Sequence, residues 1–376
     1  VGVVSVTGYT VLVVAAIATS MAAPQLLRWV VRGWEVPTEE AARLEQEAVR
    51  ATSEILGSRR ILLPTRGGDN TRYAARVLAG AFDEADVTVL AIDTPARRSL
   101  FVRRAESHAD PSNVDLGLGS IRHRVVRMKS RDPAAAIARE AALGYDTMLI
   151  GASAEDRGAA GLFSTTVDRI LSLVDLPTIV VRLPARPTVS DHPQRVLVPV
   201  VASRSSRAAE EVAFAVLQGT GGSASVVHIV SRPYNQGMMF NEGAERDTLE
   251  LAEAVTSNAV AFGERLGVTV EGMVRVASNA EAEIVALANS GEFDLLVVGA
   301  SNRPLTDRPF LGHRVHYILE HTEIPVAIVA LPGRVEASPQ PESASARDDD
   351  KGIGGAPQPT PDAPIMQTPS DITTPE

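Results

Sequence analysis

The residues best suited to chemistry in this chain are two glycines separated by a polar loop. Gly299 ends the apolar run Leu295 to Val298, and Gly312 stands just before a helical pattern. Glycines let backbone N–H groups approach phosphate oxygens, and the first turn of a helix presents its positive end to an anion. The pair therefore indicates a candidate anion site. The alternative is that both glycines only shape tight turns.

This pattern occurs twice in the chain. Residues 145–184 read YDTMLIGASAEDRGAAGLFSTTVDRILSLVDLPTIVVRLP, and residues 293–332 read FDLLVVGASNRPLTDRPFLGHRVHYILEHTEIPVAIVALP. Each contains an apolar strand, a loop, a helical pattern and a second apolar strand, which is typical of a parallel α/β unit. Four landmarks match at a constant offset of 148 positions, namely Asp146, Gly151, Ser164 and Pro177 against Asp294, Gly299, Gly312 and Pro325.

Other reactive groups give weaker signals. The chain has no cysteine, which excludes disulfides, thiolate ligands and a cysteine nucleophile. His313, His316 and His321 lack a carboxylate at matching spacing, so solvated helix residues are favoured over a metal site. There is no nucleophile elbow and no ordered triad. We therefore expect a protein that is not an enzyme and that holds no metal.

Two charged patterns have ordinary alternatives. The basic stretch Ile121 to Arg131 could attract phosphate or lipid head groups, but an edge strand protected by its charges explains it equally well. The paired carboxylates at 39–40 and 210–211 are predicted to lie on helix surfaces and to favour solubility rather than acid–base chemistry.

The elements that position the glycines form two copies of a β-α-β-α-β-α-β-α-β unit. First strands begin at Arg60 and at Arg195, an offset of 135, so the second copy holds 13 additional residues. Crossover helices force the strands to be parallel, with helices on both faces of the sheet. The remaining predicted strands are 87–92, 121–128, 224–230 and 268–276, and the predicted helices are 97–108, 133–143, 243–266 and 280–290.

Composition sets wider limits. The 376 residues are enough for two or three domains, with 45% hydrophobic, 22% charged and 4% aromatic residues. A net charge of −10 argues against nucleic acid as a partner, because such binding needs a cationic surface. Residues 334–376 are rich in Pro, Ser, Asp and Gly without apolar periodicity, and we predict a disordered tail there.

The N-terminal region resembles a membrane span. Val1 to Leu27 contains no charged residue and would extend about 40 Å as a helix, against about 30 Å for the hydrocarbon core of a bilayer. Arg28 and Arg32 follow beside two tryptophans, which predicts that this end is cytoplasmic. We expect a transmembrane helix and interface over 1–35 and a connecting helix within 36–57. The alternatives are a buried helix of a soluble domain or, less favoured, a signal peptide.

With both copies aligned, residues 58–333 resemble the universal stress protein family taken twice. That family binds phosphate through G-x2-G-x9-G-[ST], placed between its fourth strand and fourth helix. In the second copy Gly299 and Gly312 match the first and third glycines, while Asn302 and His313 replace the middle glycine and the hydroxyl residue. In the first copy Gly151 and Thr165 match, while Ala154 and Ser164 stand at glycine positions.

The family also carries an Asp after its first strand, in a P-V-D pattern beside the adenosine. Here the prolines are Pro64 and Pro199, and the Asp positions hold Arg66 and Val201. The resemblance implies that ATP, ADP, AMP or a cyclic dinucleotide is the ligand. The departures from the motif keep a second interpretation open, a dimerisation or protein-interaction scaffold that binds no nucleotide.

The resemblance further implies two Rossmann-like domains of the adenine nucleotide alpha hydrolase type, at 58–184 and 194–333. Each would be a five-stranded parallel sheet. The two would pack as a pseudo-dimer in which their last strands, 178–183 and 326–331, meet across the axis.

A second resemblance covers the N-terminal residues. The stretch TVLVVAAIATSMAAPQLLRWVVR is similar to the last transmembrane helix of monovalent cation/proton (Na+/H+) antiporters, through Thr19, Ser20, Pro24, Leu26, Leu27 and Arg28. Some such antiporters carry paired stress-protein domains. We therefore expect a regulatory, nucleotide-sensing module at the cell membrane, with its soluble domains cytoplasmic. The expected partners are the membrane, an antiporter's transmembrane core and a second copy of the chain. Residues 1–27 contain no Asp or Glu, so this chain alone carries no ions.

Overall fold

The structure is a computed structural model of the 376-residue chain. The residues it describes are 6–31, 48–82, 85–94, 116–119, 121–152, 163–184, 192–231, 242–305 and 308–333. Several predictions lie outside these residues: most of the connecting helix before residue 48, the helix at 97–108, Ala154, the linker near 185–191 and the tail from residue 334.

The two copies of the sequence pattern fold into strands and helices in the predicted order, except that the helix predicted at 97–108 lies outside the described residues and the second copy has an additional strand, β10. The first copy contains β1 (Arg60–Thr65), α3 (Asp69–Ala81), β2 (Asp86–Asp93), β3 (His123–Lys129), α4 (Pro133–Ala141), β4 (Thr147–Gly151), α5 (Thr165–Leu173) and β5 (Thr178–Arg182). The second contains β6 (Arg195–Pro199), α6 (Arg204–Thr220), β7 (Ser223–Ser231), α7 (Glu242–Arg265), β8 (Thr269–Ala277), α8 (Ala280–Ala288), β9 (Leu295–Leu305), β10 (Arg308–Phe310), α9 (His313–His321) and β11 (Val326–Pro332).

Local sequence explains where several helices begin. Asp132 precedes α4 and accepts a hydrogen bond from the Ala135 N–H, with Pro133 in the first turn, where a missing N–H costs nothing. Ser203 and Asn279 cap α6 and α8 in the same way, accepting from the N–H three residues later. Gly221 ends α6 in the left-handed conformation that glycine adopts without strain.

The strand order is the same in both copies. It runs β3-β2-β1-β4-β5 in the first and β8-β7-β6-β9-β11 in the second, with parallel pairing throughout. This confirms the predicted α/β class with a mostly parallel sheet.

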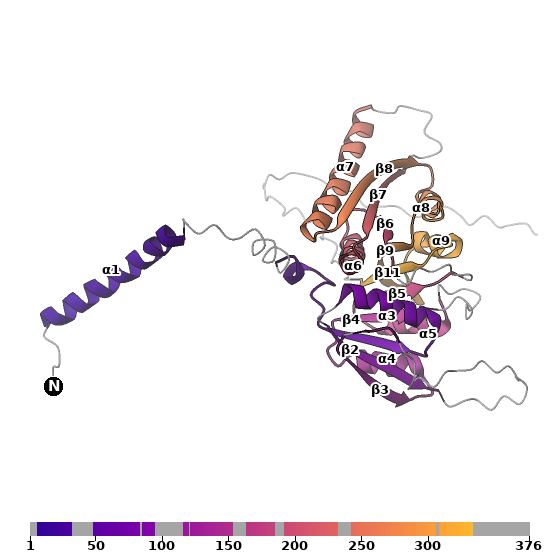
Figure 1. Ribbon diagram of the computed structural model, residues 1–376, viewed down its shortest axis with the longest axis horizontal. Helices are drawn as coiled ribbons and strands as arrows, with labels where there is room; N and C mark the ends of the chain where they lie inside the picture. The colour runs from indigo at the N-terminus through magenta and orange to yellow at the C-terminus, as the bar shows by residue number, and fades with distance from the viewer. Residues whose placement is uncertain are drawn as a thin grey trace, which may run out of the picture. The chain divides into compact units, whose positions relative to one another are not determined.

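The two blocks of strands are joined along one seam. β5 and β11 pair antiparallel, with Val180 opposite Ile328, so both blocks belong to one continuous sheet (Figure 1). The seam strands read TIVVR and VAIVALP, and their β-branched residues are buried. A strand buried on both faces and on both edges leaves no open edge at the join.

Helices cover both faces of the sheet. One apolar cluster joins the sheet to α3, α6 and α7 through Tyr73, Phe214 and Phe262. The other joins it to α4, α5, α8 and α9 through Ile137, Ile170 and Ile318. The carboxyl ends of the parallel strands, where α/β folds place their ligands, therefore open between these two helical layers.

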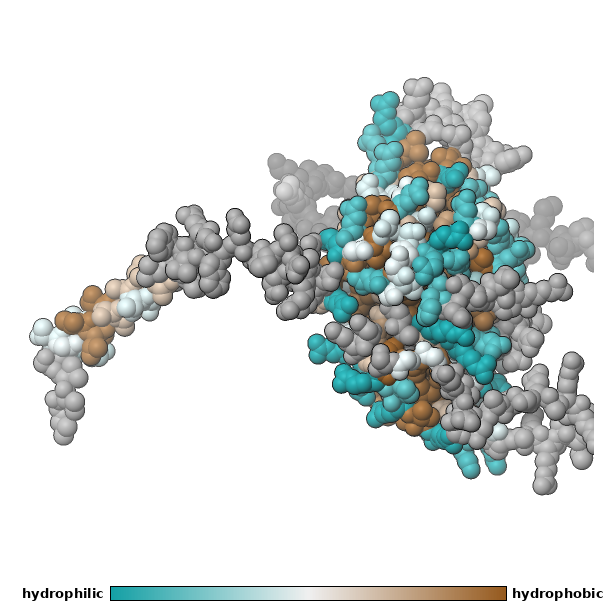
Figure 2. All heavy atoms as spheres, in the orientation of Figure 1, coloured by the Kyte–Doolittle hydropathy of each residue, from teal (hydrophilic) through white to brown (hydrophobic). Residues whose placement is uncertain are grey.

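The predicted N-terminal helix is present as α1 (Val6–Val31). Apolar side chains are exposed along it, including Leu12 and Ile17 (Figure 2). Nevertheless, within the described part of the chain no helix combines the length and the apolarity required to cross a lipid bilayer. Of the connecting helix, residues 48–52 are helical, and residues 53–57 form turns that lead into β1.

Candidate functional site

Gly151, the last residue of β4, and Gly299, the fifth residue of β9, both lie against helices. A Cβ built on Gly299 would be 2.0 Å from the Ser205 carbonyl oxygen, in the first turn of α6. A Cβ on Gly151 would be 2.4 Å from the Thr71 nitrogen, in the first turn of α3. Both glycines are therefore required by the close approach of a helix to the strand end, and that contact is the same in both copies.

The loop predicted between Gly299 and Gly312 is largely a strand and a hairpin. β9 continues to Leu305 and turns back into β10, with Leu305 opposite Arg308. From Gly299 to Asn302, β9 pairs in parallel with β11. Gly299 to Asn302 therefore lie in a strand rather than in a loop, and phosphate binding by their N–H groups stays a prediction.

At the other end of this segment, Gly312 precedes α9. Its φ of 97° and ψ of 148° lie in a region that side chains rarely allow, and no side chain caps the helix. His313 occupies the first turn and is exposed. This part of the predicted site, a helix N-terminus opened by glycine, is present.

The corresponding place in the first copy is capped by the protein itself. The Ser164 hydroxyl accepts a hydrogen bond from the Val167 N–H at 3.3 Å, and the Asp168 carboxylate accepts one from the Phe163 N–H at 3.2 Å. Thr165 follows and is exposed. Ser164 therefore caps α5, and its bond to Val167 occupies one of the N–H groups of the first turn that an anion would use.

The positions of the family's aspartates lie just beyond the first strands. Pro64 is buried in β1 and Pro199 half-buried in β6, and Arg66 and Val201 are exposed. The Val201 N–H donates to the Ser206 hydroxyl at 2.9 Å. β1 pairs in parallel with β4, and β6 with β9, so these residues lie at the same carboxyl end of the strands as Gly151 and Gly299. The predicted residues of each copy are thus close together, but no carboxylate stands at either aspartate position.

Sequence reasoning missed that Asn302 is a seam residue. Its Nδ2 donates to the Leu171 carbonyl oxygen, at the end of α5 in the other copy, at 2.6 Å. In return, Arg182 of β5 donates through Nη1 to the Leu319 carbonyl oxygen near the end of α9. Leu171 and Leu319 are equivalent residues at the offset of 148. Each copy therefore supplies a side chain that binds the same carbonyl of the other, where the helix dipole is negative.

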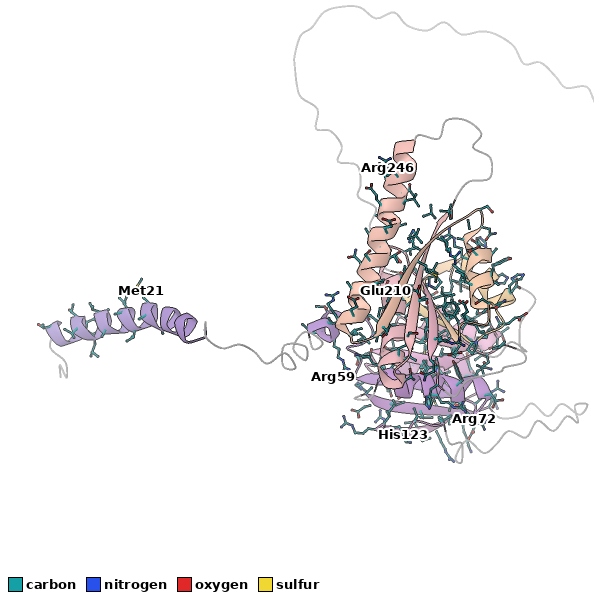
Figure 3. The ribbon with its side chains drawn as sticks, turned by 45° about the horizontal axis from the view of Figure 1, so that its top comes forward. Met21, Arg59, Arg72, His123, Glu210 and Arg246 are labelled. Carbon is teal, nitrogen blue, oxygen red and sulfur yellow. The ribbon has the colours of Figure 1, made fainter. Side chains whose placement is uncertain are left out.

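Two carboxylates predicted to be on a helix surface are buried in α6. Glu210, which is labelled in Figure 3, is 5% exposed and Glu211 is 3% exposed. Burial raises the pKa of each carboxyl group. Arg207 donates to Glu210 at 2.9 Å and lies over the Phe262 ring. The surface prediction is wrong because α6 is covered on more than one side, by the sheet and by neighbouring helices.

Glu211 binds the connecting segment that precedes β1. Its carboxylate accepts hydrogen bonds from the Ile55 N–H at 2.9 Å and the Glu54 N–H at 3.4 Å. Arg204 pairs with the Glu54 carboxylate, and Ile55 is fully buried. The segment that enters the first copy is thus held by the second copy. The sequence did contain a signal of this burial, because Glu210 and Glu211 stand between apolar residues of the same helix.

The histidines of α9 have local partners. His316 lies 3.3 Å from Glu320, and His321 stacks on Tyr317. Among the residues that the structure describes, no group of three or more His, Asp or Glu side chains could hold a metal ion. The basic stretch at 121–131 contains β3, which is an edge strand, as the charge-protection interpretation requires.

Comparison with known protein families finds a match for part of the chain. Residues 193–330, which span β6 to β11, match the model of the universal stress protein family. No curated protein matches the chain.

Solved structures similar to this chain include two universal stress proteins. The one from Archaeoglobus fulgidus shares 18% identity and a TM-score of 0.48, over 73% of this chain and 98% of that one. One from Pseudomonas aeruginosa shares 14% identity and a TM-score of 0.48, over 73% and 94%. The cytoplasmic domain of a prokaryotic cation chloride cotransporter shares 8% identity and a TM-score of 0.48, over 72% and 95%.

Proposed function

We propose that this chain is a regulatory module built from two universal stress protein domains packed as a pseudo-dimer. It acts by binding rather than by catalysis. The observation that supports this proposal is that the two copies contact each other in two ways. β5 pairs with β11, and the side chains of Asn302 and Arg182 bind equivalent backbone carbonyls of the opposite copy. A displacement of one domain therefore changes contacts of the other.

The input to this module is the connecting segment. It runs from α1 into β1 but is held by Glu211 and Arg204 of the second domain. A pull on α1 would act on both domains together. We propose that α1 attaches the module to a membrane and that the transmembrane core of a cation/proton antiporter is its partner, with the domains on the cytoplasmic side. The exposed apolar side chains of α1 and its sequence resemblance support this.

Liposome flotation of the full chain tests the membrane part. We expect the protein to float with the lipid. The double variant Leu12→Glu/Ile17→Glu changes two exposed residues of α1 and should remain with the soluble fraction, since charges in the hydrocarbon core are costly. Wild-type protein that stays in the soluble fraction would refute the attachment.

The geometry favours a scaffold that needs no nucleotide in the second domain. A phosphate-binding loop is replaced over Gly299 to Asn302 by a strand, and its pairing with β11 engages the N–H groups along one edge of that strand. The N–H of Val201, at the aspartate position, binds Ser206. Calorimetry of the full chain with ATP, ADP, AMP and a cyclic dinucleotide at millimolar concentration should give no heat of binding.

Nucleotide sensing is the second candidate function. It is supported by the family match over 193–330 and by Gly312, which opens α9 without a side-chain cap. In this case calorimetry gives a saturable heat that Gly312→Pro removes. A phosphate-release assay separates both candidates from a hydrolytic enzyme, because only an enzyme would release phosphate from ATP.

A further inference from the structure

The two ends of the sheet are protected differently. β3 and β8 are the end strands, and within the described residues each pairs with one neighbour only. The N–H and C=O groups along an end strand can pair with another chain. Residues 122–131 carry five cationic side chains and no acidic one, which repels a second copy. β8 reads TVEGMVRVA, with one acidic and one basic residue and neither Pro nor Lys.

We propose that two copies of this chain pair antiparallel through β8, about a two-fold axis at Met273. In this register Glu271 stands opposite Arg275 of the second copy, twice in the dimer. Val270 stands opposite Val276 of the second copy. Opposite charges and β-branched residues facing each other across an antiparallel pair stabilise it. The inference concerns β8 alone and is independent of α1 and of any ligand.

The charges of β8 are available for this pairing. Glu271 and Arg275 are both exposed, and neither forms an ion pair with any residue that the structure describes. Both point to the same face as Met273, since side chains alternate along a strand. Registers shifted by two residues in either direction lose both Glu–Arg pairs. A shift of four residues places Glu271 opposite Glu271 of the second copy, or Arg275 opposite Arg275 of the second copy.

The other face of β8 has a groove that the second copy would cover. It lies between α7 and β8 and is lined by Thr256, Val260, Gly272 and Val274, with Glu253 and Glu264 at its rim. Figure 1 shows α7 beside β8 at this end of the sheet. A Cβ on Gly272 would lie 2.7 Å from the Thr256 methyl group, so a larger residue at this position of the strand would meet α7.

The same register supplies apolar side chains for this groove. Val274 of the second copy stands opposite Gly272 and points to the face that carries α7. Val276, 48% exposed in the single chain, is covered by the facing Val270. The pairing is isologous, so it closes as a dimer and does not extend into a fibre.

Cysteine cross-linking in the full chain tests the pairing, because the protein has no cysteine of its own. In Met273→Cys the two new thiols face each other. Opposite residues in antiparallel strands have Cα atoms about 4.5–5.5 Å apart, within the range of a disulfide. Val125→Cys on β3 is the matched control, since Val125 is an exposed valine on the other end strand. We expect a covalent dimer from Met273→Cys and none from Val125→Cys. Equal yields from the two variants, or none from Met273→Cys, would overturn the proposal.

Charge reversal in the Met273→Cys background fixes the register. Glu271→Arg alone places like charges opposite each other twice, and the initial rate of cross-linking should fall about ten-fold. Glu271→Arg combined with Arg275→Glu restores both pairs and should restore the rate. A rate that is insensitive to Glu271→Arg, or that the double reversal fails to restore while circular dichroism stays native, contradicts this register.

Discussion

The two copies of the repeated unit differ in the segment that follows their fourth strand. In the first, Ser164 and Asp168 bind the N–H groups at the start of α5. In the second, β9 runs on into the hairpin with β10, and Gly312 leaves the start of α9 without a side-chain cap. The strand order is nevertheless identical. The shared strand order therefore does not fix the segment after the fourth strand. In the first copy this segment caps the start of α5, and in the second copy Asn302 contacts α5 of the first copy.

The shared features are those that packing requires. Gly151 and Gly299 are present in both domains because a helix backbone lies against each. Asn302 replaces a family glycine and has no side-chain equivalent at Ala154, yet it binds the first domain. Packing against a helix thus requires glycine at 151 and 299, whereas position 302 carries a side chain that makes a contact between the copies.

The largest expected effect concerns Gly151 and Gly299 and tests whether both glycines have the same packing role. Gly151→Ala and Gly299→Ala should each destabilise the fold by about 3 kcal/mol, because the added Cβ overlaps helix backbone. Urea unfolding of the full chain measures this. Gly68→Ala is the control, since its Cβ would meet nothing within 4 Å. Wild-type stability in Gly299→Ala together with altered nucleotide binding would instead assign that glycine to a ligand.

The next effect concerns the reciprocal seam contacts. Arg182→Met leaves the Leu319 carbonyl without this donor and should cost about 1–3 kcal/mol. Asn302→Ala removes the corresponding contact to Leu171 and should cost about 1 kcal/mol, since Asn302 is only half-buried. Arg66→Met, an exposed arginine of the first domain, should change stability little. If the two seam variants are as stable as Arg66→Met, the seam contacts do not hold the domains together.

The helix starts provide a smaller contrast. Ser164→Ala removes a cap and should cost about 1 kcal/mol, while Ser164→Gly should cost only a few tenths. Gly312→Ala places a side chain at a φ of 97° and should cost about 1–2 kcal/mol despite open space around its Cβ. Thermal unfolding of the three variants measures the contrast. A stabilising Gly312→Ala would show that α9 starts differently in solution.

The smallest effect is a pH trend at Glu211. Burial raises the pKa of its folded carboxyl group above the ordinary value of 4.5. The folded state therefore holds this proton more tightly, and the stability it confers is complete below about pH 4.5 and is lost as pH rises through the folded pKa. Glu211→Gln keeps an acceptor for the Ile55 N–H and does not titrate. The stability of wild type relative to this variant should decrease as pH rises above 4.5 in denaturant titrations; an increase would contradict the burial.

Much of the fold was predictable because the strands are apolar runs bounded by glycine and proline. The strand predicted at 87–92 is β2, and the helix predicted at 243–266 is α7. The β9–β10 hairpin was not predictable, since Pro304 and Pro309 argue against strands. The two prolines stand opposite each other in the hairpin, and the pairing of β9 with β11 ends at Asn302, before Pro304 is reached.

The site was predicted less well than the fold, for a physical reason. The spacing of the glycines indicates that another group lies close to the backbone there, but it does not distinguish a bound phosphate from a neighbouring helix. Likewise, Glu210 and Glu211 stand within an apolar helix pattern, which signals burial but does not name the partners that surround them. Contacts between distant parts of the chain, such as Glu211 with Ile55, leave no local pattern to detect.

Hydrogen exchange along the seam tests the central claim, that two like domains are held together through β5 and β11, most directly. The amides of 178–182 and 326–330 should be among the slowest to exchange in the full chain, because each strand is buried and paired on both edges. Fast exchange in both segments, with slow exchange kept in β1 and β6, would mean that the domains separate in solution and would contradict the account.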